Sequence, residues 1–445
     1  MDISALLPAQ AQYVASIGFF VVFLSLSLSL AWVLLAFKLR AGNGARPAWV
    51  AAYRLWVRVF ALAFVLMLAS SVPVMFQLGM LWPTLMSRIG NVLGPPLAFA
   101  VVTLFVFKSC FLGVMLFGQR RVSARMHTFS VAMVAVGLTM LAAWLTTIES
   151  WLHVPQGAVL TDGSYVSQDW LQILFNVAMP WHFLLFLAGS LLAAALLILG
   201  VTALQALRRP LDDGETVAFR AGLVIGAVAF ALLLPGLTGT AMVAARYEPV
   251  LSAAVAGYWE SGAPVRLVLW GWPDAIMQTN RADVSLPMPG SGWLGVDAGG
   301  QAIGLDHYSG MLPPVAAVFW LARLGWLVMG LSLLLMLGCW LRRTYREPRR
   351  LPTWWLRMFA GLSFAGGLTV LAGFLVLELG RYPYAVMGTV TWSESLGVDL
   401  HPAWVAIGAA GQVLLYGVLA SVFVRMVLRA ARYGVVPVRK MVRPT

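Results

Sequence analysis

The stretch GPPLAFAVVTLFVFKSCFLGVMLFG, from Gly94 to Gly118, decides the fold class of this chain. Its length and apolar composition are those of a helix that crosses a bilayer once. It carries a single charge, Lys108, near its middle. Because a lysine at that depth costs roughly 2.5–3.5 kcal/mol on insertion scales, we expect Lys108 to face protein rather than lipid.

Similar apolar stretches recur along the whole chain. Of the 445 residues, 61% are hydrophobic and 11% are charged, and the mean hydropathy is +0.85. Because a soluble domain carries about 25% charged residues, this composition predicts an all-α, polytopic membrane helix bundle. Windows of about 20 apolar residues predict nine transmembrane helices, at Tyr13–Phe37, Val57–Met80, Gly94–Gly118, Thr128–Thr147, Val177–Leu207, Ala218–Ala245, Val315–Leu341, Trp355–Leu377 and Trp404–Val427.

The basic residues predict the orientation of this bundle. Of the 30 lysines and arginines, 23 fall in one set of connections and only 5 in the opposite set. Since the basic side of a membrane protein is cytoplasmic, the N-terminus is expected outside and the C-terminus in the cytoplasm. The net charge of +13 is then a signal of topology. It predicts contact with the anionic headgroups of a lipid bilayer, not with nucleic acid.

The acidic residues and the connections divide the chain. Thirteen of the 17 acids lie at or beyond the predicted outer face, and four are cytoplasmic. No carboxylate falls at membrane depth on this map, which argues against proton coupling. The longest connection, outside the membrane, is of a length that is usually functional or folded. We therefore expect residues 1–245 to hold helices one to six, residues 246–314 to form a long outer loop, and residues 315–445 to hold helices seven to nine and a basic tail.

Three polar residues inside the predicted helices are candidates for a site. His182, about one turn into the fifth helix from the outer face, is either an intramembrane ligand or an interfacial histidine bonded to backbone or water. Arg323, two to three turns into the seventh, either clamps an anionic group or extends to the interface. Lys108 is either a counter-charge for a group in the bundle or an amine made neutral by burial. No cluster with metal-ligand spacing, phosphate-binding glycine loop or catalytic triad is present, so neither a metal site nor a catalytic residue is predicted.

Seven segments, taken in chain order, carry a resemblance to a known family. They are FQLGMLW (Phe76–Trp82), SRIGNVLGPPLAF (Ser87–Phe99), KSCFLGVMLFG (Lys108–Gly118), AAWLTTIESWLHVP (Ala142–Pro155), GWPD (Gly271–Asp274), PPVAAVFWLAR (Pro313–Arg323) and ELGRYPYAV (Glu378–Val386). Together they resemble subunit I of the cytochrome bd-type quinol oxidases, and the similarity runs through nearly the whole chain. The nine helices and the long outer loop match this family as well.

The resemblance implies a bacterial plasma (inner) membrane protein that works beside a second helical membrane subunit. The family binds three haems, oxidises quinol and reduces dioxygen to water. Its loop after helix six binds quinol, which makes Trp259, Glu260 and Asp274 the loop residues of interest here.

The family's functional positions fall mostly on residues that cannot do the same chemistry. The haem d ligand, the two haem b ligands, the glutamate of helix eight, the two glutamates of helix three, and the lysine and glutamate of the quinol loop fall in turn on Phe20, Leu185, Gly325, Leu371, Ala100, Lys108, Leu251 and Ala256. Haem iron needs axial donors such as His or Met, and phenylalanine, leucine and glycine side chains supply none. Haem d is therefore not expected.

Three hypotheses follow from the sequence. The favoured one is a non-catalytic or altered member of the family, acting within a heteromeric respiratory complex. The second is a divergent quinol-oxidising electron-transfer subunit with one haem b, held by His182 near Arg323. The third is a transporter or lipid-binding bundle built on the same scaffold.

Overall fold

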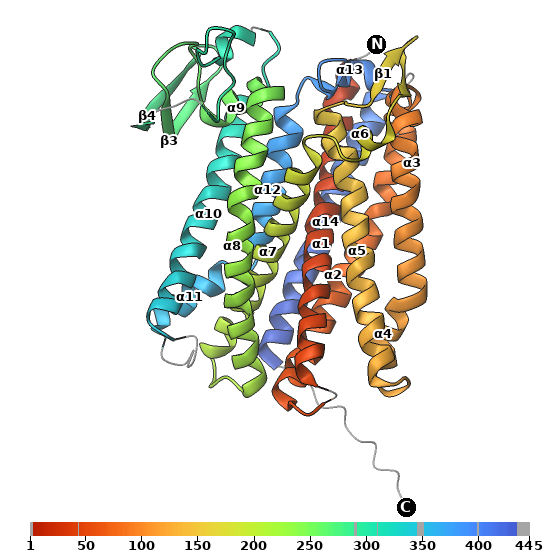
Figure 1. Cartoon of the computed structure of the whole chain (residues 1–445), viewed down its shortest axis with the longest axis vertical. Helices are drawn as coiled ribbons and strands as arrows, with labels where there is room; N and C mark the ends of the chain where they lie inside the picture. The colour runs from red at the N-terminus through yellow and green to blue at the C-terminus, as the bar shows by residue number, and fades with distance from the viewer. Residues whose placement is uncertain are drawn as a thin grey trace, which may run out of the picture.

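The computed structural model describes residues 3–42, 44–288, 292–308, 310–344, 351–397 and 400–433. The basic tail predicted at Arg439, Lys440 and Arg443 lies outside these residues. Long helices run side by side along one axis (Figure 1). They are α1 (Leu6–Ala41), α2 (Pro47–Met80), α3 (Pro83–Phe107), α5 (Ala124–His153), α7 (Met179–Ala206), α8 (Asp213–Tyr247), α10 (Val315–Leu341), α11 (Thr353–Gly361), α12 (Ala365–Gly380) and α14 (Pro402–Tyr433).

The number of membrane-crossing helices agrees with the sequence. Within the described ranges, eight helices are long and apolar enough to cross a membrane, and α11 with α12 makes a ninth span bent by 40°. The bend falls at Gly361, Leu362 and Ser363, and glycine with serine is a common cause of a helix kink. The π-helical turn Lys108–Leu112 and the short helix α4 (Gly113–Phe117) continue α3 toward the 3₁₀ turn Gly118–Arg120. The predicted polytopic helix bundle is therefore confirmed.

Helix starts follow local sequence signals. Asp212 and Glu215 form a capping box at the start of α8, in which each side chain bonds the backbone of the other residue. The Ser123 hydroxyl accepts a hydrogen bond from the Met126 amide at the start of α5. Helices α2, α3 and α7 carry proline in their first positions, where the missing N–H costs nothing.

The remaining elements gather at one end of the bundle, which we call the hairpin end (Figure 1). Three antiparallel hairpins pair β1 with β2, β3 with β4 and β5 with β6. Their bounds are Ala158–Thr161 and Ser164–Ser167, Arg266–Asp274 and Thr279–Pro287, and Tyr384–Val386 and Val390–Thr391; the short helices are Ile3–Ala5, α6 (Trp170–Leu174), α9 (Pro249–Ala256), Leu305–Tyr308 and α13 (Trp392–Ser395). The N-terminus lies at this end, and α14 runs from it to the opposite end.

Small residues bring α7 and α12 into direct contact. A methyl group added at Gly366 would lie 2.5 Å from the backbone Cα of Ala193. One added at Gly200 would lie 2.1 Å from the Ser363 hydroxyl. Glycine and other small residues permit this close approach between membrane helices. Residues from α1, α2, α5 and α7 form the largest apolar core of the bundle.

A polar network attaches α14 to α1 and α2. The Gln77 side-chain amide donates to the Ser16 hydroxyl and to Gln412 Oε1, each over 2.9 Å. Gln12 donates to the same Gln412 oxygen over 3.1 Å, and Gln412 donates to the Tyr416 hydroxyl over 2.8 Å. These bonds hold α14, whose apolar window is only 17% buried, against the rest of the chain.

Candidate functional site

Titratable side chains from three helices, one helix junction and the residue after α12 meet inside the hairpin end. We call them the buried ionic cluster. Its members are Glu149 and His153 of α5, His182 of α7, Glu248 between α8 and α9, Glu378 of α12, and Arg381 just after α12. All but Glu149 are buried.

His153 lies between two carboxylates. Its Nδ1 is 2.6 Å from Glu248 Oε1, and its Nε2 is 3.2 Å from Glu149 Oε1. A carboxylate only accepts hydrogen bonds, so a ring that serves both must donate from both nitrogens, as an imidazolium does. The three residues therefore form one hydrogen-bonded group, in which His153 and Glu248 are closed to solvent and Glu149 is partly exposed.

A second pair in the cluster keeps several polar atoms without a protein partner. Arg381 donates to Glu378 over 2.9 Å, and the two side chains are 1% and 4% exposed. Among the described residues, Arg381 Nε and Nη1 and Glu378 Oε1 have no hydrogen-bond partner. A buried group of this kind costs about 1–3 kcal/mol when it stays unpaired. These atoms make the Glu378–Arg381 pair the less completely hydrogen-bonded part of the cluster among the described residues.

His182 contacts His153 within this cluster, and no hydrogen bond or ring contact joins it to Arg323 among the described residues. It lies in the first turn of α7, as the sequence predicts, and its ring meets that of His153 edge to face at a centroid distance of 5.4 Å. Its Nδ1 is buried and has no partner among the described residues. His182 is thus a predicted site residue whose ring nitrogen Nδ1 is free to bind a ligand.

Arg323 is engaged by backbone of the long loop. Its guanidinium donates to the carbonyl oxygens of Val255, Ala256 and Val268, with 2.6 Å to the last, and stacks on the Phe319 ring. The first two carbonyls end α9, where a cation is favoured by the helix dipole. These contacts bind the guanidinium to the protein itself, and an anionic ligand of Arg323 stays a prediction. Arg323 joins α10 to the loop.

The three loop residues named from the sequence have separate environments. The indole of Trp259 is buried and donates to Asn280 Oδ1 over 3.0 Å. Asp274 ends β3 and accepts from the Ile276 and Met277 amides over 2.9 and 3.1 Å, beside Arg281. These amide bonds, and then the guanidinium, lower the pKa of the Asp274 carboxyl below its ordinary value. Glu260 is exposed on the surface. Trp259 and Asp274 thus have structural roles in the loop.

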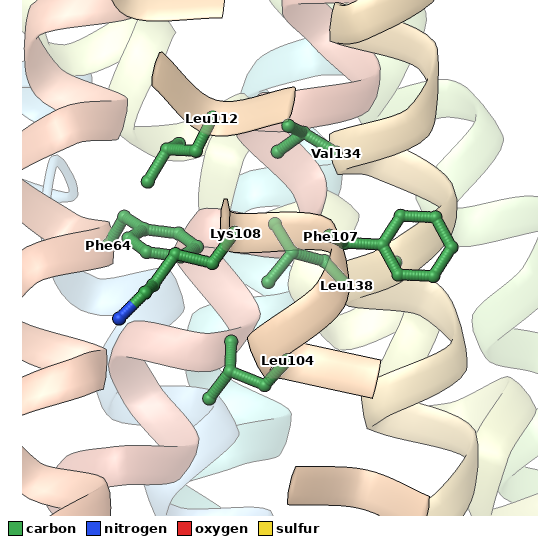
Figure 2. Close-up of a pocket in the computed structure, with 8 residues that line it drawn as sticks. Phe64, Leu104, Phe107, Lys108, Leu112, Val134 and Leu138 are labelled. Carbon is green, nitrogen blue, oxygen red and sulfur yellow. The ribbon is translucent and has the colours of Figure 1, made fainter. Parts of the chain in front are cut away.

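Lys108 lies in a small pocket between α2, α3 and α5. The pocket is partly open, and it is lined by Phe64, Leu104, Phe107, Lys108, Leu112, Val134, Gly137 and Leu138 (Figure 2). Within the described ranges, no carboxylate pairs with Lys108.

The buried acids correct one inference from the sequence. Glu248 and Glu378 were expected at or beyond the outer face, and they lie at the hairpin end of the bundle, where each is 4% exposed. The statement that the chain lacks buried acids is therefore wrong, whereas the depth of these acids in a membrane, and with it the argument about proton coupling, stays a prediction. The signal was available in the spacing, because residues three or four apart share a helix face. Glu149 with His153 and Glu378 with Arg381 have this spacing.

The fold thus defines a multi-pass helical membrane protein with an ionic cluster at one end, and comparison with known proteins gives its family. The family model for cytochrome bd terminal oxidase subunit I matches residues 9–435. The chain belongs to this family.

Individual relatives are distant, and the extent of the match differs between them. The chain is 23% identical to cytochrome bd ubiquinol oxidase subunit 1 of Bacillus subtilis (strain 168), over 97% of this chain and 94% of the relative. Over 53% of this chain and 46% of the relative, it is 24% identical to cytochrome bd-II ubiquinol oxidase subunit 1 of Escherichia coli (strain K12). The bd oxidase structure from Geobacillus thermodenitrificans superposes with a TM-score of 0.86 at 18% identity, covering 97% of this chain and 99% of that chain.

The residues at the positions taken from the resemblance do not fit haem. Phe20 is buried in the apolar core formed with α2, α5 and α7. At Leu185, α7 touches α8, since a methyl group added at Gly236 would lie 3.2 Å from the Leu185 backbone. At Gly325 an added methyl group would lie 3.9 Å from Thr369 of α12. None of these side chains has an atom that can ligate iron, and the helices around them are in contact.

Proposed function

We propose that this chain is an altered, non-catalytic counterpart of bd-type oxidase subunit I, acting within a heteromeric complex in a bacterial plasma membrane. The observation that carries the proposal is the set Phe20, Leu185 and Gly325 at the positions assigned to the haem ligands. The replacement of the quinol loop's lysine and glutamate by Leu251 and Ala256, both buried in α9, supports it further. A partner subunit would supply whatever redox chemistry the complex performs.

Difference spectra test this proposal. The protein is purified in mild detergent, alone and with its co-purifying subunit, and reduced-minus-oxidised visible spectra are recorded with a haem assay per chain. We expect no haem bound to this chain in stoichiometric amount and no quinol-dependent oxygen uptake by the chain alone. A haem d band, or three haems per chain, would overturn the proposal.

One observation favours a second candidate, a subunit with a single haem b. The buried Nδ1 of His182 has no partner among the described residues, so this ring could offer a donor atom. The discriminating variant is His182→Ala, with His307→Ala as a matched control in the loop. A b-type signal lost in His182→Ala and kept in the control supports this candidate. Absence of such a signal in the unmodified chain removes it.

A further inference from the structure

Lys108 occupies an unusual turn of a peripheral helix. Residues Lys108–Leu112 form a π-helical turn inside the span that runs from Pro83 to Arg120. Single π turns within α-helices occur frequently at functional sites. Figure 2 shows the consequence for the side chains: Phe107 and Lys108 leave the turn in opposite directions. The ring of Phe107 lies against α5, in the space that a side chain at Gly137 would fill.

The amine of Lys108 extends the other way, past Phe64 of α2 (Figure 2). Helix α3 packs chiefly along α5 and much less on α2. Lys108 is half-buried in the resulting pocket, whose other lining residues are apolar. No hydrogen bond or ion pair to the Lys108 amine is present within the described parts of the chain. The face of α2 and α3 at this level thus presents one unpaired cation in an apolar surround.

The depth of Lys108 excludes most sources of a counter-charge. It precedes Arg120 by twelve residues, or about 18 Å of helix at 1.5 Å per residue. Since the apolar core of a bilayer is about 30 Å thick, Lys108 lies close to its centre. The four-carbon stem of a lysine spans only part of that distance, and lipid phosphates stay at the headgroup level. An anion that meets Lys108 at this depth must be carried there by protein.

Large parts of the two helices beside Lys108 are not covered by the rest of the chain. The apolar windows of α3 and α2 are only 17% and 33% buried within this chain. Large apolar side chains on the two helices are exposed, namely Val65, Val72, Phe76, Phe99, Val102 and Phe105. A neighbouring membrane helix could cover this face, and an acidic side chain on it would offset the cost of Lys108.

We propose that the α2–α3 face docks a membrane helix of the second subunit, and that an Asp or Glu of this helix pairs with Lys108. The inference rests on the proposed heteromeric complex and adds the position of contact and its chemistry. Because the Lys108 amine is a cation without a partner among the described residues, in a pocket whose other lining residues are apolar, the charge complement expected of the partner helix is acidic.

The test combines charge variants with cross-linking on the full chain in its native complex. Lys108→Arg keeps the charge, Lys108→Met removes it, and Lys108→Glu reverses it; Arg120→Met is a control at the helix end. We expect co-purified second subunit per chain to fall about tenfold or more in Lys108→Met, the loss typical of a desolvated pair that loses one member. Lys108→Glu should lose more, while Lys108→Arg and Arg120→Met stay near the unmodified level. Thermal unfolding of each variant shows that the chain itself is folded.

A membrane-soluble carbodiimide then identifies the carboxylate. It should form an amide between Lys108 and an acidic residue of the second subunit, absent in Lys108→Arg. Reversing both charges should restore association. A cross-link within this chain, unchanged association in Lys108→Met, or a bound anionic lipid lost in Lys108→Met while the partner stays would each overturn the inference and leave the proposed function standing. Purification of the unmodified chain without any second subunit would overturn both.

Discussion

His153 and Glu248 form an ion pair away from water, and its energetics differ from those of a surface pair. Removal of one partner leaves the other charge buried, which costs about 3–5 kcal/mol. We therefore expect Glu248→Leu to lower the midpoint of thermal unfolding strongly. The matched control is Glu394→Leu, because the Glu394–Arg88 pair has side chains that are 51% and 32% exposed. Exposed pairs contribute only about 0–1 kcal/mol.

Tryptophan fluorescence during heating in detergent measures both variants. A clear drop in the midpoint for Glu248→Leu and almost none for Glu394→Leu is the expected result. Similar midpoints for the two variants would show that the cluster contributes no more than a surface contact.

Asp274 predicts a pH dependence of the β3–β4 hairpin. Its pKa is lowered, first by the amide hydrogen bonds of Met277 and Ile276 and then by Arg281. A carboxyl with a lowered folded-state pKa stabilises the fold fully above its ordinary value of about 3.9, and this stabilisation is lost as pH falls through the lowered pKa. Amide hydrogen exchange in the hairpin should thus rise in strong acid, below pH about 3.9. In Asp274→Asn this acid-induced rise should be missing; a rise of equal size would contradict the assignment.

At the scale of single residues, the sequence predicted the position of a side chain along its helix better than it predicted the residues that the side chain contacts. His182 lies in the first turn of α7, as its distance from the helix start predicted. Its neighbour His153 and the acids around it come from helices far apart in the chain, and no local pattern brings them together. Arg323 was interpreted through anionic ligands, whereas its partners are carbonyls of a loop whose path the sequence does not specify.

At the scale of helices, the contact between α7 and α12 depends on Gly366. A methyl group there would meet the Ala193 backbone, which cannot turn aside as a flexible side chain can. We expect Gly366→Ala to separate the helices and destabilise the protein by about 1–3 kcal/mol. Gly373, in the same helix, has open space around its Cα. Gly373→Ala should be neutral or stabilising by about 0.5–1 kcal/mol, because alanine favours helix.

Thermal unfolding of these two alanine variants separates packing from helix propensity. Opposite shifts of the unfolding midpoint are expected. If both glycines tolerate alanine equally, α7 and α12 do not pack as closely as the structure has them.

Arg323 is the link between α10 and the long loop. Arg323→Met removes the donors to Val255, Ala256 and Val268 and leaves these carbonyls unpaired. Hydrogen exchange in α9 and β3 should increase, and the loop should become sensitive to protease. Arg323→Lys should rescue little, since an ammonium lacks the planar fork that reaches several acceptors. The control, Arg266→Met at the exposed start of β3, should change neither readout; protection equal to that of the unmodified chain in Arg323→Met would contradict this role.

The spans themselves were readable from the sequence because hydropathy reports the medium directly. An apolar run of about 20 residues has few alternatives to a membrane helix. The eighth predicted span, Trp355–Leu377, hides a break, since α11 ends at Gly361 and α12 begins at Ala365. Hydropathy averages over such a break. The π turn at Lys108 is not visible in the hydropathy either. It changes the directions in which the side chains leave the helix, but not the mean hydropathy of the segment.

For the whole molecule, the distribution of basic residues over the two ends of the bundle predicts the direction in which the helices cross the membrane. The hairpins and the N-terminus share one end (Figure 1), and the arginines after α7 and before α2 lie toward the other. The excess of lysine and arginine predicts that the second end is cytoplasmic. Cysteine labelling tests this prediction. In a chain whose Cys110 and Cys339 are replaced by alanine, Met277→Cys places an exposed thiol at the hairpin end and Arg208→Cys places one at the opposite end.

A membrane-impermeant maleimide applied to intact cells (spheroplasts where an outer membrane is present) should label Met277→Cys, and should label Arg208→Cys only after the cells are opened. The physical reason is that basic loops tend to stay on the cytoplasmic side during membrane insertion. With 23 of the 30 lysines and arginines in one set of connections, this tendency predicts a single orientation for the whole bundle. The reverse labelling pattern would place the buried ionic cluster near the cytoplasm. It would also invert the depth assigned to each basic loop, while the position of Lys108 near the centre of the bilayer would be unchanged.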